Sequence, residues 1–284
     1  MPSGAEPKLL ICIGTQKAGT TWLSDYMRSR SDVHAPPVKE VHYFDARFMP
    51  KWCAKYEQEM LAGFQAEVAA LTMATCGDPA VQQRLAAMLL RFRMIADPRE
   101  YMRFMNWGRR SASILFEATP DYAMVGREGF AAMRNMAEDV RLIFLIRNPA
   151  DRFWSSLRFN KTHRPDFDIE AMFDKLIDRE DFRLLADYGR TIAEARAAVG
   201  PKRLHVAFYE TLFTAGTMQA ICRFAGLEYI APDFNARSNP SSPLEMPEEK
   251  RRRAIEAYAK AYRDIAALFP ESLPDSWRAD LERL

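Results

Sequence analysis

Two glycines and a lysine near the start of the chain have the spacing of a phosphate-binding loop. The segment Gly14-Thr15-Gln16-Lys17-Ala18-Gly19-Thr20-Thr21 follows the apolar run Leu9–Ile13 and precedes an amphipathic stretch that begins at Trp22. A short buried strand, a glycine-bounded loop and a helix start together direct backbone N–H groups at an anion. We expect Thr20 and Thr21 to cap the helix and to donate their hydroxyls to the same anion.

The position of the lysine separates this loop from that of ATP-hydrolysing enzymes. Gly14 and Gly19 have the Walker A spacing, but Walker A carries Lys directly after its second glycine, where this chain has Thr20. Lys17 lies inside the loop instead, beside the expected terminal anionic group and its bridging oxygen. That placement suits an ammonium that stabilises a departing phosphate. The alternative is an ordinary strand–helix turn with a solvated lysine.

A second anion-binding pattern follows the most apolar segment of the chain, Val140–Ile146, which we expect to be a buried strand. It ends in Arg147, and Pro149 suits the first turn of the next helix, which carries Ser155. A guanidinium fork and a hydroxyl together can bind a phosphate dianion. A Walker B strand ends in Asp, which holds Mg²⁺. The arginine here therefore argues against a nucleotide-dependent kinase or NTPase of the P-loop class, the alternative function.

An acid and a histidine follow the second predicted strand, at 32–36. Glu40 or His42 can take a proton from an acceptor hydroxyl, and this position lies one crossover after the phosphate loop. The alternative is structural: Glu40 pairs with Lys39 or a surface arginine, and His42 packs against nearby aromatic rings.

These segments resemble the sulfotransferases that use 3′-phosphoadenosine 5′-phosphosulfate (PAPS), most of all the bacterial and heparan sulfate branch. The resemblance is specific over about 8–45, 114–122, 140–156 and 203–212. It implies a P-loop-like sulfotransferase fold and transfer of a sulfuryl group from PAPS to an acceptor hydroxyl, leaving 3′,5′-ADP. The acceptor is a saccharide, a lipid or another small molecule.

The resemblance also assigns roles to individual residues. Glu40 is the expected general base, Lys17 stabilises the leaving group, and His42 orients or assists. The expected donor-binding residues are Gln16, Lys17, Ala18, Gly19, Thr20, Thr21, Arg147, Ser155, Tyr209, Arg237 and Asn239. The heparan sulfate enzymes carry an active-site lysine where this chain has Ala118. A sulfuryl group carries less charge than a phosphoryl group, so fixed cations can suffice and we expect no metal.

Composition is consistent with one globular α/β protein. The chain has 284 residues, 48% of them apolar, and 40 Lys and Arg against 38 Asp and Glu. The net charge of +2 gives no reason to expect a nucleic-acid partner. Four cysteines without metal-ligand spacing favour a reducing compartment, and no targeting or membrane-spanning segment is evident. We therefore expect a cytoplasmic protein, bacterial in style; the sequence does not predict its oligomeric state.

Apolar patterning predicts the elements that position these motifs. Strands at 9–13, 32–36, 113–117, 140–146 and 203–208 would form a mainly parallel sheet of four or five strands flanked by helices. A helical insert at about 50–110 carries a row of methionines that are either core or part of an adaptable pocket. We expect a single domain over 1–284, a last long helix over 247–268, and a solvated face at Arg251–Arg253.

Overall fold

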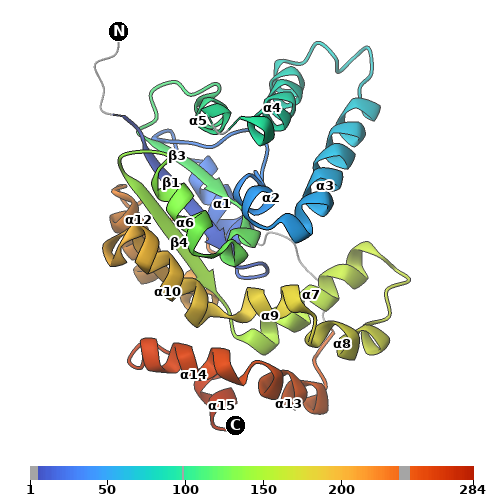
Figure 1. Cartoon of the computed structure of the whole chain (residues 1–284), viewed down its shortest axis with the longest axis vertical. Coiled ribbons are helices and arrows are strands. Elements are labelled where there is room, and N and C mark those ends of the chain that lie inside the picture. The colour runs from blue at the N-terminus through green and yellow to red at the C-terminus, as the bar shows by residue number, and fades with distance from the viewer. Residues whose placement is uncertain (1–5, 98, 237–243) are drawn as a thin grey trace.

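The computed structural model describes residues 6–97, 99–236 and 244–284. Its centre is a five-stranded parallel sheet with the strand order β2-β3-β1-β4-β5 (Figure 1). The strands are β1 (Lys8–Gly14), β2 (Val33–His34), β3 (Ile114–Ala118), β4 (Val140–Ile146) and β5 (Leu204–Phe208). The predicted α/β architecture is therefore confirmed, although β2 is shorter than expected.

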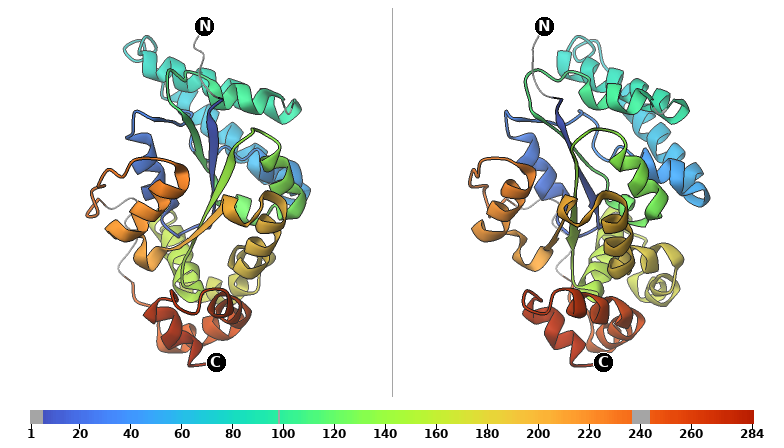
Figure 2. Two further views of the ribbon diagram at one scale, coloured as in Figure 1. Left: turned by 90° about the vertical axis from the view of Figure 1, so that its left-hand side faces the viewer. Right: turned by 60° about the vertical axis from the view of Figure 1, so that its left-hand side comes forward.

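Both faces of the sheet are covered by helices, so the strands are apolar without alternation. On one face, Leu10 and Cys12 pack with helices α1 (Thr20–Arg28) and α12 (Ala215–Ala225). On the other, Leu9 and Ile11 belong to the larger core, together with residues of α6 (Gly126–Arg134) and α10 (Tyr188–Val199). Figure 2 shows these two helical layers on opposite sides of the sheet.

The predicted helical insert lies between β2 and β3. It contains α2 (Phe44–Phe48), the long pair α3 (Pro50–Ala69) and α4 (Pro79–Ala96), and α5 (Arg99–Asn106). The methionines of the insert differ in burial. Met60, Met94 and Met105 are buried, whereas Met73, in the connection between α3 and α4, is 93% exposed. Pro79 begins α4, and the Asp78 side chain caps it by accepting from the Ala80 N–H.

Helices also extend from the carboxyl ends of the strands. They are η1 (Pro120–Met124), α7 (Pro149–His163), α8 (Ile169–Ile177), α9 (Glu180–Ala186) and α11 (Tyr209–Leu212). The short helix η2 (Pro201–Arg203) lies instead at the amino end of β5, which it directly precedes. In the described part of the chain, no helix combines the length and apolarity that a bilayer span requires.

The carboxyl-terminal region corrects two predictions. The expected helix over 247–268 is divided at Tyr258 into α13 (Glu248–Ala257) and α14 (Ala259–Leu268), and α15 (Asp275–Leu281) follows. The Tyr258 ring is buried, and its hydroxyl donates to the Ile177 carbonyl at 3.2 Å. Arg251 is not simply solvated: it forms ion pairs with Asp280 and Asp151, whereas Arg252 is exposed.

Candidate functional site

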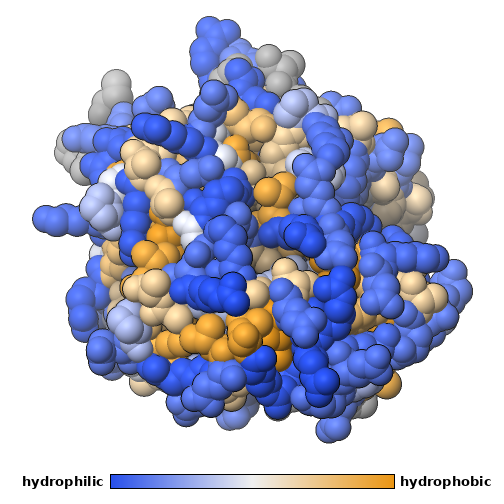
Figure 3. All heavy atoms as spheres, turned by 60° about the horizontal axis from the view of Figure 1, so that its bottom comes forward, coloured by the Kyte–Doolittle hydropathy of each residue, from blue (hydrophilic) through white to orange (hydrophobic). Residues whose placement is uncertain are grey.

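A cavity of about 1180 Å³ opens at the carboxyl ends of the central strands. The strands β2 and β3 lie on one side of β1 in the sheet, and β4 and β5 lie on the other. Because the chain connections diverge in this way at β1, a crevice forms beside its carboxyl end. Figure 3 brings this end of the molecule forward and shows hollows in which apolar side chains gather between hydrophilic ones. Most of the predicted site residues line this cavity: Gln16, Lys17, Gly19, Thr20, Thr21, Glu40, His42, Arg147, Ser155 and Tyr209.

Each glycine of the loop is required by close contacts. A Cβ on Gly14 would lie 2.5 Å from the Pro120 carbonyl oxygen, and one on Gly19 would lie 2.6 Å from Leu212 Cδ2. Gly19 is the N-cap of α1 with φ of 87°, and no side chain caps this helix. The expectation that Thr20 and Thr21 cap α1 is therefore wrong: they occupy its first turn, with their hydroxyl-bearing side chains at the cavity.

Ala18 differs from its neighbours in the loop. Its side chain is fully buried in the core beside α1, and its N–H donates to the Thr15 carbonyl at 3.3 Å. Ala18 therefore keeps the loop compact, and the cavity wall is made by the residues on either side of it.

Lys17 lies near the middle of the cavity. Its backbone has a φ of 64°, a conformation uncommon for a residue with a side chain. Its Nζ lies 3.8 Å from the centre of the Phe159 ring, a cation–π contact from α7. Burial lowers the pKa of Lys17 to about 8, and the nearby charges of Arg147, Arg158 and Lys39 act in the same direction. These gathered cations favour an anionic ligand.

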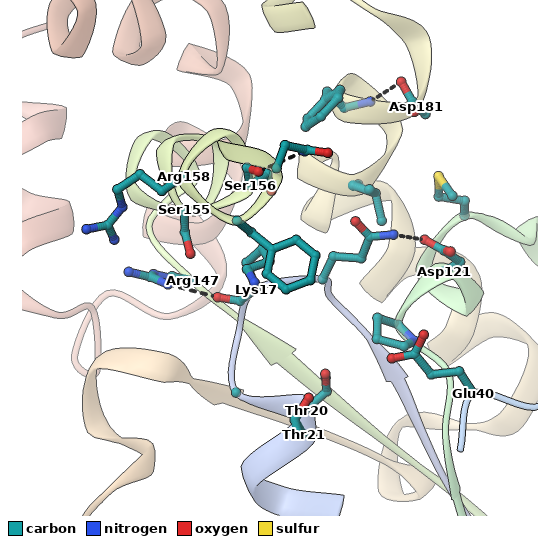
Figure 4. Close-up of a pocket in the computed structure, with 18 of the residues that line it drawn as sticks. Lys17, Thr20, Thr21, Glu40, Asp121, Arg147, Ser155, Ser156, Arg158 and Asp181 are labelled. Carbon is teal, nitrogen blue, oxygen red and sulfur yellow. Dashed lines mark hydrogen bonds between the residues drawn. The ribbon is translucent and has the colours of Figure 1, made fainter. Parts of the chain in front are cut away.

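Arg147, Ser155 and Arg158 lie on one side of Lys17 (Figure 4). Arg147 donates to the Lys17 carbonyl at 3.0 Å, and its guanidinium lies 4.2 Å from the centre of the Tyr209 ring. Asn148 caps α7 by accepting from the N–H groups of Ala150 and Asp151. Sequence reasoning missed Arg158, although its position one turn after Ser155 was a usable signal.

Aromatic rings surround the same side of the cavity. Trp22 packs edge-on against Phe213 at 5.0 Å and stacks with Phe234 at 6.1 Å, and Tyr209 packs edge-on against Phe213 at 5.3 Å between centres. All four line the cavity. Flat apolar walls next to cations suit a nucleotide, whose base needs apolar cover and whose phosphates need positive charge.

Glu40 lies on the other side of Lys17, with Asp121 (Figure 4). Glu40 Oε1 is 3.3 Å from Lys39 Nζ, and Oε2 is 3.8 Å from His42 Nε2. The predicted pairing of Glu40 with Lys39 is thus present, but within the cavity wall. Glu40 and His42 have φ values of 57° and 52°, so this segment is held in an unfavourable backbone conformation.

His42 is oriented by Asp45. Its Nδ1 lies 2.6 Å from Asp45 Oδ2, and its ring stacks on Tyr56 at 4.7 Å. Burial alone would lower the pKa of His42, but the hydrogen bond and charge of Asp45 raise it above its ordinary value. With a carboxylate at Nδ1, the Nε2 atom faces Glu40 and the cavity.

Backbone groups of the Glu40 segment are held from two directions. The buried Arg91 of α4 donates to the carbonyls of Glu40 and Val41 at 2.6 and 2.9 Å. From η1 and the end of β3, the hydroxyls of Thr119 and Tyr122 accept from the N–H groups of Val41 and Tyr43 at 2.9 and 3.0 Å. We call this arrangement the loop clamp: Arg91, Thr119 and Tyr122.

Buried acids support the clamp and the cavity wall. Burial raises the pKa of Glu117 to about 7, and Thr119 donates to Glu117 at 3.0 Å, so Glu117 is a support and not a cavity residue. Burial also raises the pKa of Asp121 to about 6, and Asp121 accepts from the Gln16 side chain at 2.5 Å.

One cluster has the composition of a metal site. His42, Asp45 and Asp121 offer ligand atoms that lie within 4.8 Å of one another. His42 and Asp45 are already hydrogen-bonded to each other, and Asp121 is bonded to Gln16. These three side chains are therefore joined by hydrogen bonds to one another or to Gln16.

Two predicted donor-binding residues, Arg237 and Asn239, lie outside the described residues. Ala118 is buried at the end of β3, and among described residues the cavity cations are Lys17, Lys39, Lys55, Arg147, Arg158, Arg164 and Arg179. The insert methionines do not line the cavity; Met124 and Met172 do.

Comparison with known proteins identifies the class. A sequence profile of the sulfotransferase family matches residues 8–231, so the chain belongs to the sulfotransferase family. Family and fold together support a transferase that moves a sulfuryl group.

Solved structures agree on the fold. The chain is similar to a sulfotransferase from Alicyclobacillus acidocaldarius, with 20% identity, a TM-score of 0.67, and coverage of 97% of this chain and 100% of that one. It is also similar to the sulfotransferase domain of the olefin synthase of Synechococcus PCC 7002, with 15% identity, a TM-score of 0.54, and coverage of 96% and 98%. No curated protein sequence matches the chain.

Proposed function

We propose that this protein transfers a sulfuryl group from PAPS to the hydroxyl of a saccharide, lipid or other small-molecule acceptor. The observation that carries the proposal is the position of Lys17 between two unlike groups of residues. Arg147, Arg158 and Ser155 lie on one side of it, and Glu40 lies on the other (Figure 4). A donor anion and an acceptor hydroxyl would therefore meet at the ammonium.

The described residues fit the donor. The first turn of α1 and the loop before it present N–H groups to an anion, and Thr20 and Thr21 add hydroxyls. Arg147 and Ser155 would hold the 3′-phosphate, and Arg158 adds a further positive charge. Trp22 and Tyr209 supply part of an aromatic enclosure for the base.

PAPS supplies the sulfuryl group: its sulfur–oxygen bond to the phosphate breaks as the acceptor oxygen attaches, and 3′,5′-ADP leaves. Glu40 takes the proton from the acceptor hydroxyl. Lys17 places its positive charge beside the oxygen that gains the electron pair. His42, fixed through Nδ1 by Asp45, directs Nε2 at Glu40 and orients that carboxylate.

We further propose that fixed cations take the place of a divalent metal here. A P-loop kinase or NTPase remains the competing function, and it needs Mg²⁺ and an acid at the end of the strand that would hold it. This chain has Arg147 at that position, and its guanidinium is already engaged with the loop carbonyl of Lys17.

The test is nucleotide-dependent thermal stabilisation. A ligand that binds the native state alone raises the melting temperature. We expect stabilisation by 3′,5′-ADP in the presence of a chelator, weaker stabilisation by 5′-ADP, and loss of the difference in Arg147→Ala. Stabilisation by ATP with Mg²⁺, and none by 3′,5′-ADP, would favour the kinase and refute the proposal.

A further inference from the structure

We propose that the acceptor is a hydroxyl compound with an apolar body, such as a fatty alcohol or a fused-ring phenol, and not a saccharide. This inference rests on the proposed function, because it assigns the acceptor side of the same cavity. It follows from the residues that line the cavity on the Glu40 side, and from the hydrogen bonds that the polar groups there already make within the protein.

The cavity has two sides that come from different elements. Residues of α1, the end of β4, α7 and α11 form the donor side described above. The opposite side is built by α3, η1, α8 and α9, together with the loop before α8. We call this second part the acceptor wall; its apolar members are Trp52, Tyr56, Pro120, Met124, Phe167, Met172, Leu176, Phe182 and Leu185.

The acceptor wall contacts His42 and the phosphate loop. Tyr56 stacks on the His42 ring at 4.7 Å between centres. The Leu185 carbonyl accepts from the Thr15 hydroxyl at 3.2 Å, which ties α9 to the phosphate loop. Because Glu40 Oε2 is 3.8 Å from His42 Nε2, an acceptor hydroxyl placed at Glu40 would lie close to the part of the wall that begins at Tyr56.

Polar groups on this side are already bonded within the protein. The Asp121 carboxylate accepts from the Gln16 side chain. The Asp181 carboxylate forms a bidentate ion pair with the Arg179 guanidinium, with hydrogen bonds of 2.6 and 2.7 Å. On α7, which belongs to the donor side, Asn160 donates to the Ser156 carbonyl at 2.9 Å, and the Ser156 hydroxyl donates to the Arg152 carbonyl at 3.1 Å. A saccharide has many hydroxyls that lose their water on binding, and each needs a new partner. Each existing bond uses part of the bonding capacity of its group, so fewer positions remain for the hydroxyls of a sugar.

Charged residues of this side lie at its outer edge. The side chains of Lys55, Glu59 and Arg179 are 50, 52 and 53% exposed. Leu176, Phe182 and Leu185 are almost fully buried, so the apolar surface open to a ligand comes mainly from the partly exposed Trp52, Phe167 and Met172. An apolar floor with a charged rim is the pattern of a pocket that takes an apolar body and leaves its far end to solvent.

The chemistry of the step is unchanged by this assignment. The acceptor oxygen forms the new bond to sulfur, its proton goes to Glu40, and the electron pair of the broken bond goes to 3′,5′-ADP. The apolar wall contributes by excluding water, which would otherwise compete as the acceptor.

The experiment measures direct binding and turnover with matched probes. The intact protein, saturated with 3′,5′-ADP, is titrated with 2-naphthol, 1-octanol, methyl glucoside and methyl N-acetylglucosaminide. The same four compounds are then tested with PAPS. We expect the two apolar compounds to bind and to be sulfated, and both sugars to bind at least tenfold more weakly.

Wall variants localise the binding. Met172 and Phe167 are half-buried on the wall, so Met172→Ser and Phe167→Ser remove contact area without emptying the core. We expect each to raise the Kd and the KM for 2-naphthol by about tenfold, with the affinity for 3′,5′-ADP unchanged. Leu61→Ser is the matched control: Leu61 lies outside the cavity and is 47% exposed.

Two results would overturn the inference. One is tighter binding or faster sulfation of a sugar than of 2-naphthol and 1-octanol. The other is a Met172→Ser variant that behaves like Leu61→Ser. If 2-naphthol binds but 3′,5′-ADP neither binds nor stabilises the protein, the proposed function fails while the apolar pocket stands.

Discussion

The ammonium of Lys17 lies where several positive charges of the site act on one group. This ammonium is largely removed from water, faces Arg147, Arg158 and Lys39, and is held over the Phe159 ring. Each of these three positive neighbours makes the protonated form of Lys17 less favourable, and a bound anion would make it more favourable. The affinity for the donor and the protonation of Lys17 are therefore linked.

This linkage predicts a pH dependence of nucleotide binding. The pKa of Lys17 is lowered to about 8, so the positive charge is present below that pH and is lost as pH rises through it. We expect the affinity for 3′,5′-ADP, measured by calorimetry between about pH 6.5 and about pH 9.5, to fall on the alkaline side. Lys17→Gln should bind more weakly and lack the alkaline fall. A wild-type affinity that stays constant across this range would contradict the assignment.

Glu40 gives a test of the chemical step that is separate from binding. Removing a general base costs about 10²–10⁴-fold in rate. We expect Glu40→Gln to lose that much in kcat while its affinity for 3′,5′-ADP stays near the wild-type value. The matched control is Glu59→Gln, because Glu59 lies at the cavity rim and is half-exposed. Equal kcat values for the two variants would remove Glu40 from the mechanism.

At the scale of elements, the helical insert supports the Glu40 segment. Arg91 reaches from α4 to two carbonyls of that segment, and Thr119 and Tyr122 hold the N–H groups of Val41 and Tyr43. Because Glu40 and His42 both have positive φ, the segment needs these bonds to keep its conformation. The insert therefore positions Glu40 and His42, the proposed catalytic residues, as well as covering the core.

Arg91→Met tests this support, with Arg93→Met on the same helix as the control, since Arg93 is 62% exposed. We expect the Arg91 variant to lose roughly tenfold to a hundredfold in kcat, because small displacements of a catalytic group are costly. Its affinity for 3′,5′-ADP should not change. A parallel loss of nucleotide affinity would indicate general unfolding of the site and not a local displacement.

Gly19 tests the junction between the loop and α1. Gly19→Ala adds a Cβ 2.6 Å from Leu212 Cδ2 on a backbone with φ of 87°. We expect it to lower the free energy of unfolding in urea by about 1–3 kcal/mol and to abolish stabilisation by 3′,5′-ADP. Gly63→Ala is the control, because Gly63 is helical with nothing near its Cβ position, and it should be neutral or stabilising. A fully stable Gly19→Ala protein would show that the junction tolerates a side chain.

At the scale of the whole molecule, the last three helices are joined to the sheet. Trp277 of α15 is fully buried and packs edge-on against Phe208 of β5 at 5.5 Å between centres. Asp280 is 2% exposed and accepts from Asn148 at 2.8 Å and from Arg251 at 2.7 Å. Asn148 caps α7, the helix that carries Ser155 and Arg158. The carboxyl-terminal helices thus support the donor side, although the family profile ends at residue 231.

Asp280→Ala tests this connection. Arg251 keeps its ion pair with Asp151 when Asp280 is removed, but the buried Asn148 amide loses its acceptor. We therefore expect a loss of about 1–3 kcal/mol in urea unfolding. Asp275→Ala, at an exposed position of the same helix, should cost much less. The double variant Arg251→Met/Asp280→Leu should recover part of the loss. An Asp280→Ala protein as stable as Asp275→Ala would show that the network is not stabilising.

The sequence predicted the features that depend on residues close together in the chain, such as strands and loops. It missed the features that depend on packing between distant residues. The prediction of a strand at Val140–Ile146 is confirmed, because a strand buried on both faces is continuously apolar and can be recognised from its sequence. The contact between Lys17 and Phe159, and the pair of Arg251 with Asp280, join residues far apart in the chain, so no local pattern marks them. The division at Tyr258 was missed because the flanking helices are both amphipathic and give one continuous pattern.

The acceptor wall and the donor side come from separate blocks of the chain. The wall uses 52–56, 120–124 and 167–185, whereas the donor side uses 16–22, 147–158 and 209–234. The two blocks are joined by the bonds of Gln16 to Asp121 and of Thr15 to Leu185, and we expect substitutions that spare these bonds to leave the donor side intact. A library that randomises Phe167, Met172 and Leu176 would be expected to change acceptor preference while every active member still reports through the same 3′,5′-ADP product, so one assay would serve to redirect the enzyme to new alcohols.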